Sequence, residues 1–284
     1  MSDKPWAFLM RLLAADGSGW DVCRAMTFPL SCAATWAVLA VSIIAATPLL
    51  AADGAAVVRA SQTPSTIVIG FVGGFVRHDN PHHGPVLFAE RLHRIAPKNA
   101  YIRVFENRRR KAAYRTILHL LDRNGDGILS AEEKAQARII LYGESWGGAA
   151  TVMLARELNR LEIPVMLTVQ VDSVAKLWER DGIVPANVAA AVNFYQSNGI
   201  IHGRAKIEAA DPARTQVLGN YRSDYKQNPV KCEGYSWADR TFTRGHMEAE
   251  CDPHVWSQVE DLMRPRLETP SAVAVNPGQL ESGH

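Results

Sequence analysis

The stretch from residue 137 to residue 161 constrains the fold of this chain more than any other part of the sequence. Residues 138–142 form a short apolar run rich in β-branched and aromatic side chains, which predicts a buried strand. The sequence Gly-Glu-Ser-Trp-Gly-Gly follows at once, and residues 149–161 then carry apolar side chains at helical spacing. A strand, a tight Gly-x-Ser-x-Gly turn and a helix predict a nucleophile elbow, which exposes the Ser145 hydroxyl above a sheet edge. A plain glycine-rich turn capped by this serine is the alternative.

Two segments predict backbone amides for an oxyanion hole beside that serine. Trp146 would begin the helix, so its amide points to a position where a negative oxygen can form. Residues 66–72 predict another buried strand, and the two glycines after it let the backbone approach a ligand and present amides. We therefore expect the amides of Gly74, Phe75 and Trp146 to face the oxyanion. An ordinary strand-ending turn is the alternative for the first two.

A carboxylate at the end of the next strand is the candidate acid. Residues 164–171 predict a buried parallel strand that ends at Asp172. Since the carboxyl ends of parallel strands share one edge of a sheet, Asp172 can orient a histidine and stabilise its protonated form. A turn cap is the alternative role for this aspartate, and Glu208 and Asp211 are the other candidate acids. Further strands are expected at residues 100–105 and 188–195.

The histidine that best suits a general base is His246. We expect it in a loop after the last strand and before a final amphipathic helix at residues 253–263. The other candidates are His254, at the expected start of that helix, and His202. Residues 203–243 are polar and predict no particular element. Three further histidines have no metal-ligand spacing around them, so we interpret them as solvated or as part of a substrate rim: His78, His82 and His83.

A second motif, at residues 122–133, matches a calcium-binding loop of the EF-hand type. Oxygen-bearing residues occupy loop positions 1, 3, 5, 9 and 12, and a glycine at position 6 allows the sharp bend. Because only one such loop occurs, we expect a structural calcium clamp rather than a paired sensor. A capped loop between two helices is the alternative. The expected ligands, including one backbone carbonyl at position 7, are Asp122, Asn124, Asp126, Ile128, Ser130 and Glu133.

The first 60 residues differ from the rest of the chain. Basic residues precede an almost uncharged apolar run at residues 33–46, and small residues follow near position 51, which is the order of a secretory signal. Without cleavage, residues 27–52 are long enough to span a bilayer as an anchor. Both alternatives predict export, periplasmic or secreted, or attachment to a membrane. The chain therefore divides into this segment at residues 1–60, a folded domain at 61–265 and a disordered polar tail at 266–284.

The number and positions of the cysteines are consistent with an oxidising compartment. Two of the four lie in or before the apolar segment, so an exported domain keeps only Cys232 and Cys251. We predict a disulfide between them, which would close a loop around His246, and two buried free thiols are the alternative. The net charge of +2 gives no indication of a nucleic-acid partner, and we expect a monomer.

These residues together resemble the α/β-hydrolase superfamily, in its lipase, esterase and thioesterase-like branches, over about residues 65–265. The resemblance rests on the glycine turn at residues 73–75, the elbow around Ser145, Asp172 and His246. It implies an α/β fold, with a mostly parallel sheet, helices on both faces and a catalytic edge at the carboxyl ends of the strands. Two features depart from the family: most members carry the acid one strand later, and the calcium-type loop is not general.

The activity that this resemblance implies is acyl transfer to water. Ser145 would attack an ester or thioester carbonyl, in a small molecule or a lipid, while His246 takes its proton and Asp172 holds the histidine. The sequence does not fix the acyl group or the leaving group. A membrane-tethered, calcium-binding scaffold or binding domain on an inactive hydrolase fold is the alternative function.

Overall fold

A computed structural model of the chain describes residues 64–235 and 243–268. All described residues belong to one compact unit of the chain. The expected signal or anchor segment, with its span at residues 27–52, lies outside the described residues, as does the tail from residue 269. Within the described part of the chain, no helix has both the length and the apolar character that crossing a membrane requires.

Within that part, six parallel strands form the central sheet in the order β2-β1-β3-β4-β6-β8. All residues of β1 and β3 are buried, because helices cover both faces of the sheet. This double cover explains why β1 and most of β3 are continuous apolar runs in the sequence. The bounds are β1 Ile67–Val72, β2 Tyr101–Glu106, β3 Ile139–Glu144, β4 Val165–Val171, β6 Val188–Gln196 and β8 Gln216–Ser223.

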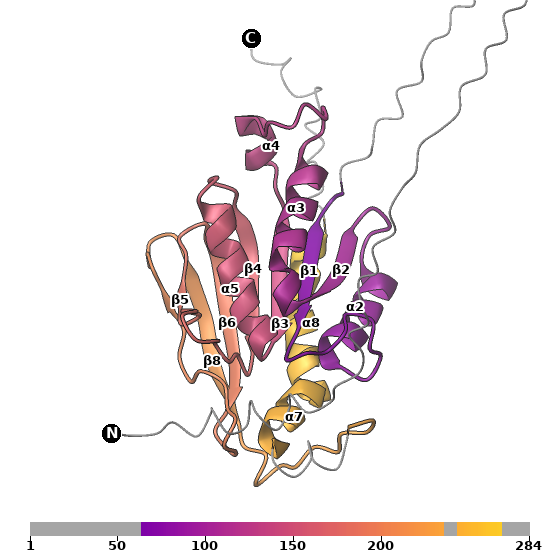
Figure 1. Cartoon of the computed structure of the whole chain (residues 1–284), viewed down its shortest axis with the longest axis vertical. Helices are drawn as coiled ribbons and strands as arrows, with labels where there is room; N and C mark the ends of the chain where they lie inside the picture. The colour runs from indigo at the N-terminus through magenta and orange to yellow at the C-terminus, as the bar shows by residue number, and fades with distance from the viewer. Residues whose placement is uncertain (1–63, 236–242, 269–284) are drawn as a thin grey trace, which may run out of the picture. The chain divides into compact units, whose positions relative to one another are not determined.

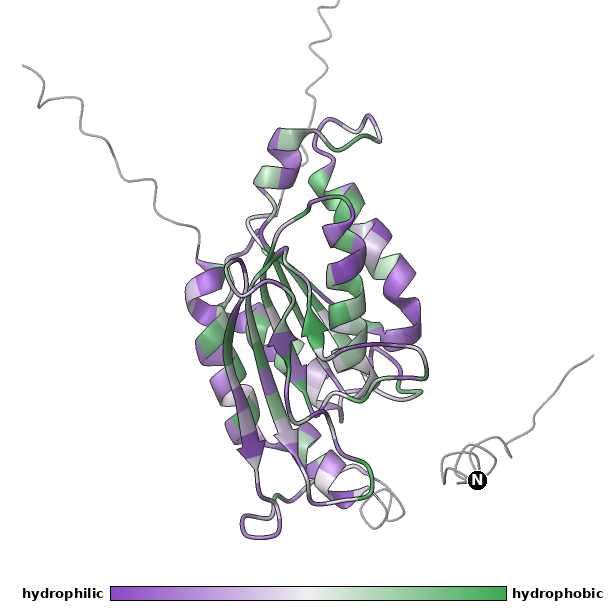
Figure 2. Ribbon diagram, turned by 90° about the vertical axis from the view of Figure 1, so that its left-hand side faces the viewer, coloured by the Kyte–Doolittle hydropathy of each residue, from purple (hydrophilic) through white to green (hydrophobic). Residues whose placement is uncertain are grey.

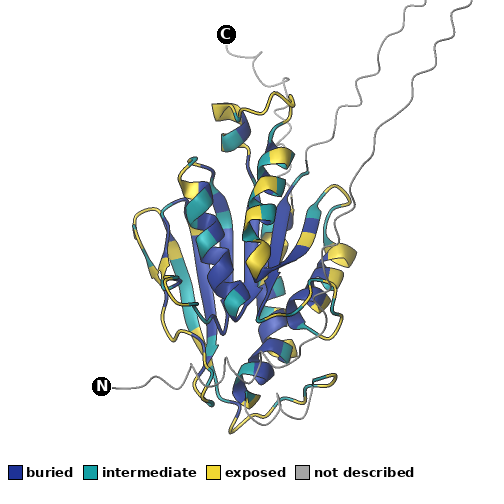
Figure 3. Cartoon of the chain, viewed as in Figure 1, coloured by how far each residue is buried: buried dark blue, intermediate teal, exposed yellow. Residues whose placement is uncertain are grey.

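Two pairs of helices cover the sheet, one pair on each face (Figure 1). Helices α2 (Gly84–Ile95) and α8 (Pro253–Leu267) bury Phe88, Leu92 and Trp256 against one face. Helices α3 (Arg110–Leu121) and α5 (Trp146–Asn159) bury their apolar residues against the other. Figure 2 shows polar residues on the outward sides of these helices, and Figure 3 shows that the strands between them are mostly buried. The expected parallel sheet with helices on both faces is therefore confirmed.

Shorter elements complete the described residues. A 3-10 turn, η1 (Asn107–Arg109), joins β2 to α3, and the short helix α4 (Ala131–Ala135) precedes β3. Strands β5 (Ile183–Val184) and β7 (Glu208–Ala209) pair in a small separate sheet. Helix α7 (Arg244–Cys251) packs beside the end of β6. In the chain it comes immediately before α8.

The structure differs from the sequence expectations at three places. We expected His246 in a loop, but it lies in helix α7. The unassigned polar region contains β8, an edge strand whose residues are mostly half-buried or exposed and therefore give no apolar run. Helix α8 continues to Leu267, which is buried, so the ordered domain extends beyond residue 265 into the range expected for the tail.

Candidate functional site

The turn between β3 and α5 holds its serine in a strained conformation. Ser145 has φ 55° and ψ −125°, a region that residues other than glycine rarely occupy. The turn is so tight that a Cβ atom on Gly143 would overlap the backbone of Gly147. Such strain persists only where the surrounding structure enforces it, and here a buried strand and a buried helix fix both ends of the turn.

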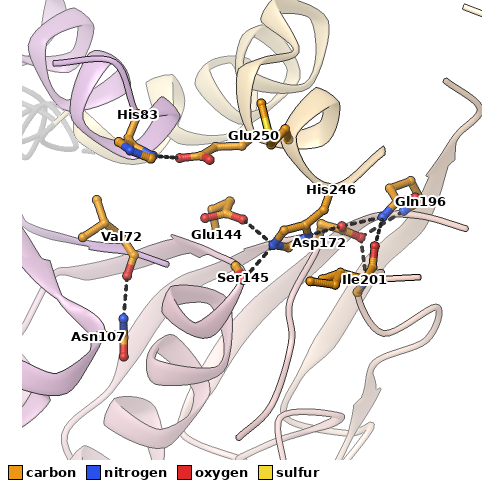
Figure 4. A network of polar contacts seen from close by, with 12 residues as sticks. Val72, His83, Asn107, Glu144, Ser145, Asp172, Gln196, Ile201, His246 and Glu250 are labelled. Atoms are coloured by element: carbon orange, nitrogen blue, oxygen red, sulfur yellow. Dashed lines mark hydrogen bonds and ion pairs between the residues drawn. The ribbon is translucent and has the colours of Figure 1, made fainter. Parts of the chain in front are cut away.

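Three of the sequence-predicted residues meet at this turn (Figure 4). His246 Nε2 lies 2.8 Å from Ser145 Oγ, and His246 Nδ1 lies 2.6 Å from Asp172 Oδ2. Ser145 comes from the turn between β3 and α5, Asp172 from the end of β4 and His246 from α7. Along the chain, Asp172 lies 27 residues after Ser145, and His246 lies 74 residues after Asp172. A histidine between a hydroxyl and a carboxylate is the arrangement that general-base activation of a nucleophile requires.

Asp172 is held rigidly at the end of β4. It is fully buried, its φ is 41°, and its carboxylate accepts hydrogen bonds from the amide of Gly203 at 2.7 Å and from Nε2 of Gln196 at 2.8 Å. The other candidate acids lie elsewhere: Glu208 forms an ion pair with Lys206, and neither Glu208 nor Asp211 pairs with His246. The structure thus brings Asp172, among the three candidate acids, to the histidine.

The other candidate bases do not reach the serine. His254 Nε2 is bonded to the side chain of Gln258 on the surface of α8. The Nδ1 atom of His202 lies 3.3 Å from the carbonyl oxygen of Gly203. His83, which we expected to be solvated or at a substrate rim, is instead paired with the buried carboxylate of Glu250 on α7 at 2.6 Å (Figure 4). His246 is the histidine that the structure places against Ser145.

Glu144, the residue before the serine, is a second carboxyl group at His246 that the sequence reasoning missed. It is 3% exposed, and its Oε1 lies 3.2 Å from His246 Nε2. A carboxylate at this distance could form an ion pair with a protonated imidazole. However, burial, and then the charges of Glu250 and Asp172, raise the pKa of Glu144 well above its usual range. Glu144 therefore holds its proton more tightly than a free carboxyl group does. Its only sequence signal is a carboxyl residue that ends an apolar strand.

The two segments expected to supply the oxyanion amides are close to Ser145. Gly73 packs directly against Ser145, and Gly74 has a positive φ of 43°. The rings of Phe75 and Trp146 are in edge-to-face contact with centroids 5.4 Å apart, although Phe75 is 67% exposed. The turn after β1 and the start of α5 are therefore adjacent. Whether their amides bind an oxyanion stays a prediction.

The calcium-type loop lies between α3 and α4. Both carboxylate oxygens of Asp122 accept backbone amides, from Gly125 at 2.8 Å and Gly127 at 2.9 Å. Glu133 accepts the amides of Arg123 and Ser130, and the Ser130 amide gives the largest contribution to lowering the Glu133 pKa. Among the described residues, no three His, Cys, Asp or Glu side chains are grouped to hold a metal ion. The calcium prediction continues to rest on the sequence pattern.

The two cysteines of the described part are bonded to each other. Cys232 and Cys251 form a disulfide with their Cα atoms 5.9 Å apart, and their positions in the sequence differ by 19. Cys251 is the last residue of α7, and His246 lies in the first turn of the same helix. The bond therefore fixes the far end of this helix to the segment after β8.

Comparisons with known proteins give no family for this chain. No protein-family model matches it, and no curated protein does. Among solved structures, it is similar to a thermostable esterase from Pseudomonas putida (TM-score 0.41, 10% identity, 73% of this chain and 76% of that one). It is also similar to RedJ with a PEG molecule bound in its active site (0.36, 8%, 65% and 90%). A third is a dienelactone hydrolase-like promiscuous phosphotriesterase from metagenomic libraries (0.34, 14%, 73% and 89%). At these TM-scores the fold assignment rests on the strand order and helix placement described above.

Proposed function

We propose that this chain is a serine hydrolase that cleaves a carboxylic ester or thioester. The observation that supports this most is the continuous contact from Ser145 Oγ through both nitrogens of His246 to Asp172, at 2.8 and 2.6 Å. Support also comes from the strained φ of 55° at Ser145, because strain of this kind gathers at functional sites. A structural serine cap needs neither a histidine partner nor a buried carboxylate behind it.

The proposed mechanism follows from the position of each group. Ser145 Oγ attacks the carbonyl carbon while its proton passes to Nε2 of His246, and Asp172 holds the Nδ1 proton and stabilises the imidazolium. The imidazolium then gives its proton to the departing alcohol or thiol, which leaves an acyl group on Ser145. Water, deprotonated by the same nitrogen, releases the acid and restores the serine. Amides of Phe75 and Trp146 would stabilise each oxyanion, by about 3 kcal/mol per donor.

A fluorophosphonate probe tests the proposal directly. The purified full-length protein should be labelled, and Ser145→Ala should abolish both the label and the hydrolysis of short p-nitrophenyl esters. Ser173→Ala is the matched control, because this buried serine lies at the same sheet edge but donates its hydroxyl to Asp181 at 2.6 Å. The control should still be labelled. Absence of labelling in the wild-type protein would remove the hydrolase proposal and favour a membrane-tethered binding domain.

Two further proposals accompany the hydrolase. We infer from the loop sequence that residues 122–133 bind one Ca²⁺, which braces the segment leading into β3. From the order of basic, apolar and small residues at the N-terminus we infer that the domain is exported or held at a membrane. The disulfide between Cys232 and Cys251 agrees with an oxidising compartment. The substrate would be a small-molecule or lipid ester.

A further inference from the structure

The turn after β1 contains backbone amides without an acceptor. Residues 73–76 form a tight turn, closed by a hydrogen bond of 3.3 Å from the Val76 amide to the Gly73 carbonyl. Among the described residues, neither the Gly74 amide nor the Phe75 amide has a hydrogen-bond acceptor in the chain. An unpaired amide can stabilise an oxyanion only if its direction is fixed before the reaction begins. Some other group must therefore hold the turn.

Asn107 is the side chain that holds it. This residue follows β2 directly and is 3% exposed. Its Nδ2 group donates to the carbonyl oxygen of Gly74 at 2.6 Å and to that of Val72 at 3.2 Å. Figure 4 shows Asn107 facing Val72. One planar amide therefore bonds two carbonyls that lie on either side of Gly73.

These two bonds determine where the attached amides point. The carbonyl of Gly74 and the amide of Phe75 belong to one planar peptide unit and point in opposite directions. Because Asn107 fixes the carbonyl of Gly74, it also turns the Phe75 amide away from itself. The neighbouring peptide unit, between Val72 and Gly73, is held in the same way, because its carbonyl oxygen accepts from Asn107 at 3.2 Å. The Gly73 amide at the other side of this unit lowers the pKa of Glu144.

A lysine fixes the orientation of Asn107 itself. Lys176 Nζ donates to Asn107 Oδ1, so the amide nitrogen must face the two carbonyls. Lys176 Nζ also lies 5.1 Å from the centroid of the Trp146 ring, which contacts the Phe75 ring. The same group of contacts therefore reaches the turn after β1 and the start of α5, the two expected sources of oxyanion donors.

We propose that Asn107 is a positioning residue of the hydrolase reaction, which sets the direction of the Phe75 amide toward the oxyanion. The inference rests on the proposed function. Asn107 does not touch the reacting atoms, and it acts through the rigid peptide unit between Gly74 and Phe75. Its loss should therefore reduce transition-state stabilisation while leaving substrate binding nearly unchanged.

Two substitutions test this in the full-length protein. Asn107→Asp keeps the shape of the side chain and an oxygen for Lys176, but it places an acceptor instead of a donor opposite the carbonyls of Val72 and Gly74. Asn107→Ala removes the donor without adding a charge. With p-nitrophenyl acetate, each should lower kcat by about 10²–10³-fold, as loss of one oxyanion donor does, with KM changed less than about threefold. Asn80→Asp is the matched control, because the Oδ1 atom of Asn80 accepts an amide and an aspartate retains that acceptor.

A second readout separates positioning from a general loss of stability. Hydrogen exchange of the peptide covering residues 72–76 should be faster in both Asn107 variants, while exchange in β3 and α5 stays as in the wild type. Unchanged kcat in both variants, with normal labelling of Ser145, would overturn the positioning role and leave the hydrolase proposal intact. A fall in kcat with no change in exchange at residues 72–76 would also overturn it. Failure of the wild-type protein to react with the probe would overturn both.

Discussion

The raised pKa of Glu144 predicts how the stability of the protein changes with pH. A carboxyl group whose pKa is raised on folding binds its proton more tightly in the folded than in the unfolded state. Below its usual pKa of 4.5 both states are protonated and the group has no effect. Above 4.5 the unfolded state ionises first, so the wild-type protein loses stability until the pH reaches the raised pKa. Glu144→Gln keeps the shape of the side chain and removes this loss.

The size of the effect follows from the linkage between protonation and folding. One proton bound only by the folded state changes the free energy of unfolding by about 1.4 kcal/mol per pH unit. For a domain of about 200 residues, this corresponds to about 3–5 °C in Tm per pH unit. The melting temperatures of wild type and Glu144→Gln, measured in steps from about pH 3.5 to 7.5 at constant ionic strength, should therefore diverge in favour of the variant above pH 4.5.

Parallel curves would refute the reasoning, because they would mean that Glu144 ionises equally in both states. Glu106→Gln provides a control of opposite sign. Burial alone would raise the pKa of Glu106, but the hydrogen bond from His78, at 2.9 Å, and backbone amides leave the pKa below its usual value. The wild type should therefore lose stability relative to Glu106→Gln as the pH falls below 4.5, where the Glu144 variant shows no further change.

Two other predictions concern the proposed calcium site and the disulfide. Calcium at 100 times its Kd should stabilise the folded protein by about 2.7 kcal/mol, and Glu133→Gln should reduce this shift in differential scanning fluorimetry; an equal calcium response in wild type and variant would exclude residues 122–133 as the site. The double change Cys232→Ser and Cys251→Ser should lower the free energy of unfolding in urea by about 3 kcal/mol, because a loop of 19 residues is no longer closed in the unfolded chain. Equal urea midpoints for the two proteins would show that the bond adds nothing to stability.

Most of the fold could be predicted because the central strands are local, unambiguous patterns. Strands β1, β3 and β4 are buried on both faces and therefore appear as mostly apolar runs. Strand β8 could not be predicted, since it lies at the sheet edge, where half-exposed positions accept polar residues. Helix α7 was missed for a related reason: its eight residues include a glycine and few apolar side chains, and contacts outside the helix, including the disulfide, support it.

The candidate site was predictable in part. The motif around Ser145 specifies a turn by its glycines, and the structure contains that turn with the expected strain. Asp172 could be placed at the same edge, because every strand of the sheet runs in one direction. Glu144 and Asn107 could not be identified in this way. The raised pKa of Glu144 depends on its burial and on the charge of Glu250, and the role of Asn107 depends on Lys176. Both partners are distant in sequence.

The sequence by itself determined the secondary structure of the core and the types of residue at the carboxyl ends of the strands. Apolar periodicity and glycine spacing act over a few residues and can be recognised in the chain alone. Only the tertiary structure decided which histidine contacts Ser145 and which acid contacts that histidine, because several of each satisfy the same local pattern. It also raised the pKa of Glu144, because removal from water and the proximity of other carboxylates arise only when distant segments pack together.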